Sequence, residues 1–489
     1  MLKNTFIWII LFIASFQTIA AQEKSEWKQI FSNINQEALD HSSAYETLKE
    51  ATETIGHRLT GSANGKKAEE FTYQLLKNYG FTNLRYQPFE VESWSRGNLT
   101  LAIGTDTNHL STVKSVSLAH SPVQVDLSNE VVDMGNGLEE DYMAEPEKAK
   151  GKIALVYLGV LPGSKSGTKS LHRSEKTAIA TKYGATGIIV INTATGGILL
   201  TGTASVTGKL IPIPAVCVGK EDGMKLKEDL KNAKLYAHIK MNNFSGLIKA
   251  RNVIATIKGK TLPNEKIVVG GHLDSWDLAT GAIDNGIGSF AVLDMARTFA
   301  ALKLQPERTV EFVLFMGEEE GLLGSRAYVD AAIKDQSIDQ IRYMLNYDMT
   351  HDPKGYNSTD EGSKALFTSI GTIAHSLDSN FKNTFNSGAG LHSDHQPFML
   401  RGVPTGGSSG NGLPNNAGPC YHADCDVFSL VDKKGMVNNV RFSSMLLYGI
   451  ADANEITAKH LNDEETRIFL EKNKLKEPLQ IAGEWRWKN

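Results

Sequence analysis

Cysteine is scarce in this sequence: its 489 residues include only Cys217, Cys420 and Cys425. So few cysteines exclude a fold held together by a disulfide framework, and a buried hydrophobic core must stabilise the chain instead. Cys420 and Cys425 are near enough in sequence to form one local bridge in an oxidising compartment, and free thiols are the alternative. One cysteine is left over in either case.

An excess of charge of one sign is also missing. The 51 Lys and Arg residues and the 55 Asp and Glu residues give a net charge of −4 at neutral pH. Nucleic-acid-binding domains usually carry a basic excess, so we expect no nucleic-acid partner. Hydrophobic residues make up 41% of the chain, which is ordinary for a globular enzyme, and the length predicts two or three domains.

Long hydrophobic runs are absent after residue 21, and no later stretch approaches the roughly eighteen apolar residues that span a bilayer. Residues 1–21 differ, because Lys3 precedes an apolar stretch over residues 6–16 and small residues follow at 18–21. This pattern predicts a secretory signal peptide, with an uncleaved anchor as the alternative. We therefore expect a secreted or periplasmic protein without stable membrane insertion.

Several well-known catalytic motifs are absent as well. The chain has neither the His-Glu-x-x-His helix of a single-zinc protease nor a phosphate-binding loop. Residues 406–410 match the Gly-x-Ser-x-Gly elbow of serine hydrolases, which requires a strand before it and a helix after it. Pro404 precedes this match and Asn-Gly-Leu-Pro follows it, so we predict a loop and no serine chemistry.

What is present is a change of pattern along the chain. Helical periodicity over residues 44–55 and 68–79 gives way to short β-type runs, and then to alternating strands and helices. The alternation predicts an α/β fold with a mostly parallel central sheet flanked by helices. We expect residues 22–119 to form the N-terminal part of the main domain, 120–244 a small β-rich insertion, 245–457 the rest of the main domain, and 458–489 a docked or loose tail.

Polar side chains follow three apolar strands at the point where each strand ends. His272 and Asp274 follow one strand, Glu318 and Glu319 the next, and Asp348 a third. In open parallel sheets, sites form at the carboxyl ends of the strands. Each cluster alone is typical of a solvated helix start or a cap, but their recurrence at equivalent strand ends favours a metal site. Imidazole and carboxylate ligands together suit zinc, with other divalent metals as alternatives.

Three motifs then resemble a known family. Residues 271–277 read Gly-His-Leu-Asp-Ser-Trp-Asp, 281–286 read Gly-Ala-Ile-Asp-Asn-Gly, and 317–325 read Gly-Glu-Glu-Glu-Gly-Leu-Leu-Gly-Ser. In this order and spacing they resemble the co-catalytic zinc aminopeptidase family, which includes bacterial leucine aminopeptidases, glutamate carboxypeptidase and plasma glutamate carboxypeptidase. The resemblance covers residues 245–457, as the zinc peptidase catalytic domain, and the N-terminal helices.

The resemblance implies two Zn²⁺ ions per chain. The ligands that it assigns are His272 and Asp348 for the first zinc, Glu319 and His422 for the second, and Asp284 as the bridge. Asp274 would orient the imidazole of the first histidine. The last histidine lies in Tyr-His-Ala-Asp (421–424), which is similar to a family motif, and the two histidines of the 390–398 segment are the alternatives.

The implied mechanism uses Glu318 as general base, and Asp274 is the second predicted catalytic residue. Two metals about 3.5–4 Å apart lower the pKa of a bridging water, so that hydroxide is available near neutral pH. Glu318 would take the proton of this water and return it to the departing amine. We expect five further residues on the substrate side of the site: Trp276, His392, Asp394, His395 and Tyr421.

Residues 151–156, 182–190 and 213–216 of the insertion resemble a protease-associated domain. Such a domain would border the cleft and restrict it to chain ends, or it would merely cover apolar surface. We therefore predict an exported zinc exopeptidase with a peptide substrate, most simply an aminopeptidase or dipeptidase. The sequence leaves open a homodimer, a carboxypeptidase of the plasma glutamate carboxypeptidase type, a single-zinc glutaminyl cyclase and a non-enzymatic receptor-like scaffold.

Overall fold

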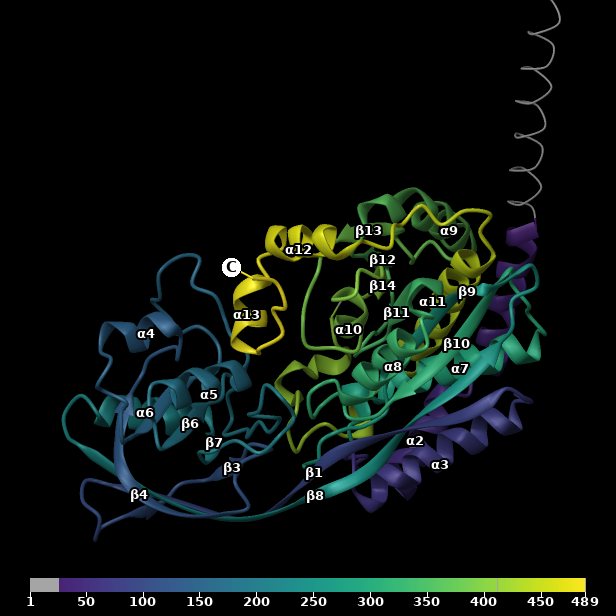
Figure 1. The fold of residues 1–489 in the computed structure, drawn as a ribbon. Coiled ribbons are helices and arrows are strands. Elements are labelled where there is room, and N and C mark those ends of the chain that lie inside the picture. The colour runs from purple at the N-terminus through teal and green to yellow at the C-terminus, as the bar shows by residue number, and fades with distance from the viewer. Residues whose placement is uncertain (1–25, 411, 489) are drawn as a thin grey trace, which may run out of the picture.

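The computed structural model describes residues 26–410 and 412–488 (Figure 1). The predicted signal peptide, residues 1–21, lies outside them. The described chain is organised around a 14-stranded sheet with the order β13-β12-β14-β11-β9-β10-β8-β4-β5-β6-β7-β3, to which β1 and β2 are attached. Among the described residues, no helix combines the length and the apolar character needed to cross a membrane.

The main domain holds a mixed, mostly parallel part of the sheet. Strands β9, β10, β11 and β14 run parallel to one another, whereas β8 pairs with β10 and β12 pairs with β14 in the antiparallel sense. The elements from β8 onward are β8 (Leu235–Ile257), β9 (Leu262–His272), α7 (Ile287–Ala301), β10 (Arg308–Phe315), α8 (Leu323–Lys334), β11 (Ile341–Asn346), β12 (Gly355–Ser358), α9 (Lys364–Leu377), β13 (Thr384–Ser387), α10 (His395–Met399), β14 (Thr405–Ser409) and α11 (Lys433–Asp452).

Helices cover both faces of this part of the sheet. In β10, Phe312 and Leu314 join one hydrophobic cluster with α2, α7 and α11, whereas Val313 and Phe315 join another with α8 and α10. Because successive strand residues point to opposite faces, a strand segment covered on both sides favours apolar residues at successive positions. This explains why the sequence shows continuous apolar runs, such as residues 312–315, within these strands.

A long two-stranded ribbon joins the main domain to the insertion. Strand β1 (Leu84–Gly104) pairs antiparallel with β8 over almost its whole length and runs along the lower edge of the molecule (Figure 1). A bulge between Ser95 and Asn98 interrupts the register. Gly97 lies there against the backbone oxygen of Asn242, where a Cβ atom would come within 1.8 Å, so the close approach requires glycine.

The insertion continues the same sheet, and helices accompany its predicted strands. Strands β4 to β7 run parallel in sequence order. The prediction from sequence missed these helices. In α5 the first residues are polar although they are buried, and this removes the apolar pattern by which a helix is recognised. The elements are β2 (Ser111–Thr112), β3 (Ser115–Ser117), β4 (Gln124–Asp133), α4 (Glu139–Ala144), β5 (Ile153–Tyr157), α5 (Arg173–Lys182), β6 (Gly187–Ile191), β7 (Ala215–Val218) and α6 (Lys220–Asp229).

Both ends of the described chain pack against the main domain. At the N-terminal end, residues 26–41 are helical, and α2 (Ala44–Thr54) and α3 (Ala63–Asn78) follow. The C-terminal tail is docked, since α12 (Asp463–Lys472) and α13 (Lys476–Ile481) bury Leu470 and Leu479 against Met399 and Leu400. The loop predicted at residues 406–410 is wrong: residues 405–409 form β14, although no helix follows directly as an elbow requires.

Candidate metal centre

The polar residues predicted at the strand ends meet at one edge of the sheet. His272 is the last residue of β9, and Asp348 lies two residues beyond β11. After β10, Gly317 adopts φ +76°, a conformation that favours glycine, and the chain turns there so that Glu318 and Glu319 follow at this edge. The three strands are parallel neighbours, which brings their carboxyl ends together.

Asp284 lies between the two histidines of the site. It belongs to a turn, η1 (Ala282–Gly286), directly before α7, and its peptide bond to Asn285 is cis. Its Oδ1 lies 3.2 Å from Nε2 of His272, and its Oδ2 lies 2.9 Å from Nε2 of His422. The two imidazoles lower the pKa of the Asp284 carboxyl, although burial acts in the opposite direction.

Each histidine contacts one further carboxylate. Nε2 of His272 lies 3.4 Å from Oδ1 of Asp348, and Nε2 of His422 lies 2.9 Å from Oε2 of Glu319. The site therefore contains two sets of one imidazole and one carboxylate, and Asp284 belongs to both. His422 occupies the position that the sequence left open between three histidines.

The chemistry of these groups fits a divalent metal site. Ligand atoms of His272, Asp284 and Glu319 all lie within 4.8 Å of one another. Among the described residues, Oε1 of Glu319 and Oδ1 of Asp348 are buried without a hydrogen-bond partner. Buried carboxylate oxygens normally require a donor or a cation, and mixed imidazole and carboxylate ligands are typical of zinc.

Asp274 fixes the groups around it through several contacts. Its backbone oxygen lies 3.1 Å from Nδ1 of His272, and its carboxylate oxygen Oδ1 lies 3.6 Å from the same nitrogen. The carboxylate accepts hydrogen bonds from the backbone N–H groups of Glu318 and Glu319, both at 3.3 Å, and from the Thr60 hydroxyl at 3.1 Å. One buried carboxylate thus orients a histidine and the turn that carries both glutamates.

The titration behaviour of Glu318 and His272 reflects their shared burial. Burial raises the pKa of Glu318 well above its usual value, and the neighbouring Asp348 carboxylate adds to the rise. Burial alone lowers the pKa of His272, but the carboxylates of Glu318 and Asp348 outweigh it and raise this pKa well above its usual value. A carboxyl group with a raised pKa can both take and return a proton near neutral pH.

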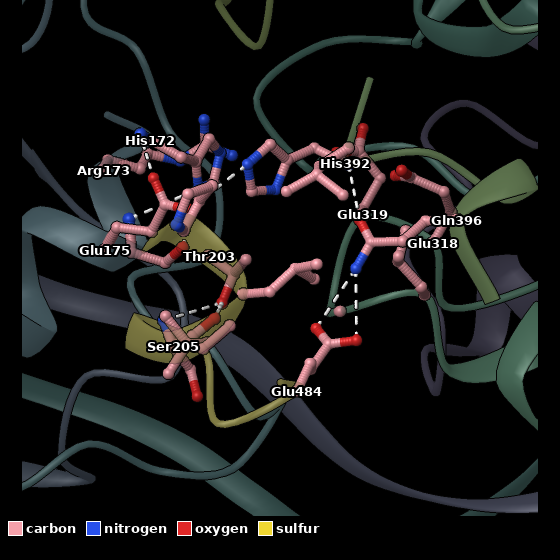
Figure 2. Close-up of a pocket in the computed structure, with 18 of the residues that line it drawn as sticks. His172, Arg173, Glu175, Thr203, Ser205, Glu318, Glu319, His392, Gln396 and Glu484 are labelled. Carbon is pink, nitrogen blue, oxygen red and sulfur yellow. Dashed lines mark hydrogen bonds and ion pairs between the residues drawn. The ribbon is translucent and has the colours of Figure 1, made fainter. Parts of the chain in front are cut away.

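Two of the five residues predicted on the substrate side line a cavity next to the metal centre (Figure 2). Glu318, Glu319 and His422 border this cavity together with His392 and Tyr421. Helix α5 of the insertion and residues 478–484 form other parts of its wall.

The remaining predicted substrate residues lie around this cavity rather than in its lining. Trp276 packs edge-on against the His422 ring. His395 borders a neighbouring pocket with Asp348. Asp394 is fully buried, and burial raises its pKa to about 7.

Sequence reasoning missed two residues that contact the site. Asp426 accepts hydrogen bonds from the backbone N–H groups of Ile283 and Asp284, at 2.7 and 3.0 Å, and so holds the turn that carries Asp284. Arg173, the first residue of α5, lies 3.0 Å from Nδ1 of His422. Asp426 follows a cysteine and Arg173 begins a helix, and both patterns are common in proteins. Neither pattern therefore indicates a functional residue in the sequence.

Comparisons with known proteins agree with this geometry. Residues 252–447 match peptidase family M28, and residues 123–226 match the PA domain. "Leucine aminopeptidase 2" of Trichophyton equinum is 31% identical over 366 residues, which cover 72% of this chain and 68% of that protein. The chain belongs to peptidase family M28. The predicted family and the α/β fold with its inserted PA domain are confirmed, and the protein is a peptidase.

Other M28 relatives match a larger share of the chain. "Carboxypeptidase Q" of Mus musculus is 26% identical over 422 residues, which cover 84% of this chain and 86% of that protein. The crystal structure of a peptidase M28 precursor from Shewanella amazonensis superposes with a TM-score of 0.77, at 23% identity, and covers 90% of this chain and 99% of that one. Similarity at that level of identity shows the fold, which extends over the PA domain.

Proposed function

We propose that the protein is an exported exopeptidase that depends on two zinc ions and hydrolyses short peptides. The observation that carries the proposal is the position of Asp284 between His272 and His422. Two sets of imidazole and carboxylate ligands that share one carboxylate are what a pair of adjacent metals requires. His272 and Asp348 would hold one ion, His422 and Glu319 the other, and Asp284 would bridge them.

The metals and Glu318 have separate tasks in the proposed hydrolysis. When bound, the two ions supply an activated water and polarise the carbonyl of the peptide bond. Glu318, which lines the cavity, takes the proton of the attacking water and passes it to the departing amine. Asp274 acts through the groups that it orients and does not touch the substrate.

Restriction to chain ends is supported by the walls of the cavity. Figure 2 shows Arg173 and Glu175 of helix α5, from the PA domain, on the side of the cavity away from Glu318, so an uninterrupted polypeptide has little room to pass through. The names of the relatives, leucine aminopeptidase and carboxypeptidase Q, describe action at opposite ends of a peptide. A dipeptidase combines the two, because both ends of its substrate are adjacent to the bond that it cleaves.

Arg173 favours recognition of a free C-terminal carboxylate. Its side chain is 3% exposed and lines the cavity, and no carboxylate within residues 26–410 or 412–488 forms an ion pair with it. Gly202 makes room for the guanidinium, since a Cβ atom there would lie 1.8 Å from Nη2 of Arg173. A buried cation without a partner is costly, and a substrate carboxylate would supply the missing charge.

Metal binding would make this guanidinium available. In the structure, Arg173 donates to Nδ1 of His422, so that nitrogen must carry a lone pair. A neutral histidine that binds zinc through Nε2 carries its proton on Nδ1 and cannot accept this bond. We therefore expect Arg173 to turn from His422 to the substrate when zinc is bound.

The proposal is tested by counting zinc in the purified chain and by comparing three dipeptides: one with free ends, one N-blocked and one C-amidated. We expect two zinc ions per chain, hydrolysis of the free dipeptide, and loss of activity with a chelator that zinc restores. One zinc per chain would favour the glutaminyl cyclase alternative, and zinc without hydrolysis of any peptide would favour a scaffold. Export is tested by determining the N-terminus and the compartment of the full-length chain after expression.

A further inference from the structure

The C-terminal segment, residues 463–488, forms one wall of the cavity beside the metal centre. In Figure 1 its helix α13 lies between the PA domain and the helices of the main domain. The cavity is bordered by Glu318, Glu319 and His422, and the segment contributes Pro478, Leu479, Ala482 and Glu484 to the same lining. One wall of the cavity thus comes from the C-terminal segment.

The segment is fixed to the main domain by Glu484. Its carboxylate accepts two hydrogen bonds from the Arg326 guanidinium, at 2.9 and 2.8 Å, and two from the Gln396 amide, both at 3.2 Å. Figure 2 shows Glu484 pointing toward Gln396 at the border of the cavity. Paired contacts of a carboxylate with a guanidinium are strong and directional, so they hold this wall in one position.

Other residues of the segment contact the PA domain. Ile481 packs against the hydrophobic core of that domain. The Glu477 carboxylate lies 2.6 Å from the Lys169 ammonium. The segment therefore closes the space between the two domains on the side of the cavity.

A second, more open groove adjoins the cavity. Pro478, His392 and Tyr421 line both spaces, as does Arg173 of α5. A peptide that extended from the cavity into the groove would therefore pass beside Pro478 of the C-terminal segment. The width of this passage depends on where the C-terminal segment is docked.

We infer that the C-terminal segment sets the length of the substrate, admitting short peptides and excluding longer ones. This inference rests on the proposed exopeptidase function. The wall would exclude longer peptides sterically rather than by charge, because Pro478, Leu479 and Ala482 are uncharged and the Glu484 charge is paired with Arg326.

The test compares kcat/KM for a dipeptide and for a tetrapeptide that begins with the same two residues, in the zinc-loaded full chain. Glu484→Ala removes the anchor and should raise the tetrapeptide-to-dipeptide ratio about fivefold or more. Ala482→Phe adds bulk inside the cavity without loosening the wall and should lower the same ratio about tenfold. Ile468→Ala, at an exposed position of α12 in the same segment, is the matched control and should leave the ratio as it is.

Hydrogen exchange gives a readout that does not depend on turnover. A dipeptide analogue that cannot be cleaved should slow amide exchange over residues 478–484 in the unaltered chain. The inference is overturned if both variants hydrolyse the dipeptide but keep the original ratio, or if the analogue leaves exchange in these residues unchanged. If the unaltered chain cleaves neither peptide, the proposed function fails first, and this inference fails with it.

Discussion

The guanidinium of Arg173 and the imidazole of His422 lie in hydrogen-bond contact, 3.0 Å apart, although 249 positions separate them in the sequence. Arg173 begins the first helix after β5 in the PA domain, whereas His422 belongs to the metal centre of the main domain. The PA domain therefore contributes a charged side chain directly at the candidate metal centre, beyond any role in covering apolar surface.

Replacing Arg173 should impair recognition of the substrate carboxylate. We expect Arg173→Gln to lower kcat/KM for a dipeptide with a free C-terminus about 10- to 100-fold, because one charge-assisted interaction of about 1.5–3 kcal/mol is lost. The C-amidated dipeptide, which has no carboxylate to lose, should change much less. Steady-state kinetics on both substrates measures the difference, and an equal loss on both would contradict carboxylate recognition.

Glu318 and Glu319 are neighbours in sequence, but their substitution should have different effects. Glu318→Gln should lower kcat by about 10²- to 10⁴-fold while the zinc content stays the same, because only proton transfer is lost. Glu319→Gln should instead reduce the zinc content, since the carboxylate that contacts His422 is removed. Elemental analysis and kinetics of both variants test this. Unchanged turnover in Glu318→Gln would refute the assigned base.

Asp426 should control metal affinity without touching the metal. Its carboxylate accepts two backbone N–H groups, and in Asp426→Asn the amide group would face one of these donors with its own N–H. The turn that carries Asp284 would shift, and we expect zinc affinity to fall about 10- to 100-fold. Competition with a fluorescent chelator measures this affinity. Asp424→Asn, at a nearby exposed residue, is the control and should bind zinc like the unaltered chain.

Stability in mild acid should depend on His120 in the PA domain. Its ring is fully buried, with Nδ1 2.8 Å from the Thr203 hydroxyl, and burial lowers its pKa to about 4. Between about pH 6.5 and 4 the unfolded chain binds a proton that the folded chain does not, so stability falls as the pH falls, by at most about 3 kcal/mol.

Urea unfolding between pH 4 and 7 checks the contribution of His120. In His120→Gln this group no longer titrates, so the loss of unfolding free energy toward acid pH should be smaller than in the unaltered chain. His109→Gln, which alters an exposed histidine of the same region, should keep the original slope. Identical slopes in all three proteins would show that His120 does not carry this dependence.

The main domain could be predicted from sequence because its signals are local. Runs such as residues 312–315 are apolar throughout, and they lie in a strand covered on both faces. The insertion was predicted less completely. The start of α5 buries Arg173, Glu175 and Lys176, and polar residues in a buried helix remove the periodicity from which a helix is recognised.

By itself, the sequence determined which residues stand at the strand ends: His272, Glu318, Glu319 and Asp348 each follow an apolar run that parallel pairing brings to one edge. Only the tertiary structure decided what meets them there. Arg173, Asp426 and Glu484 come from segments distant in sequence from these strand ends, and their neighbours in sequence are typical of exposed polar residues. The physical reason is that their roles arise from burial and long-range contact, and neither property is encoded in the spacing of neighbouring residues.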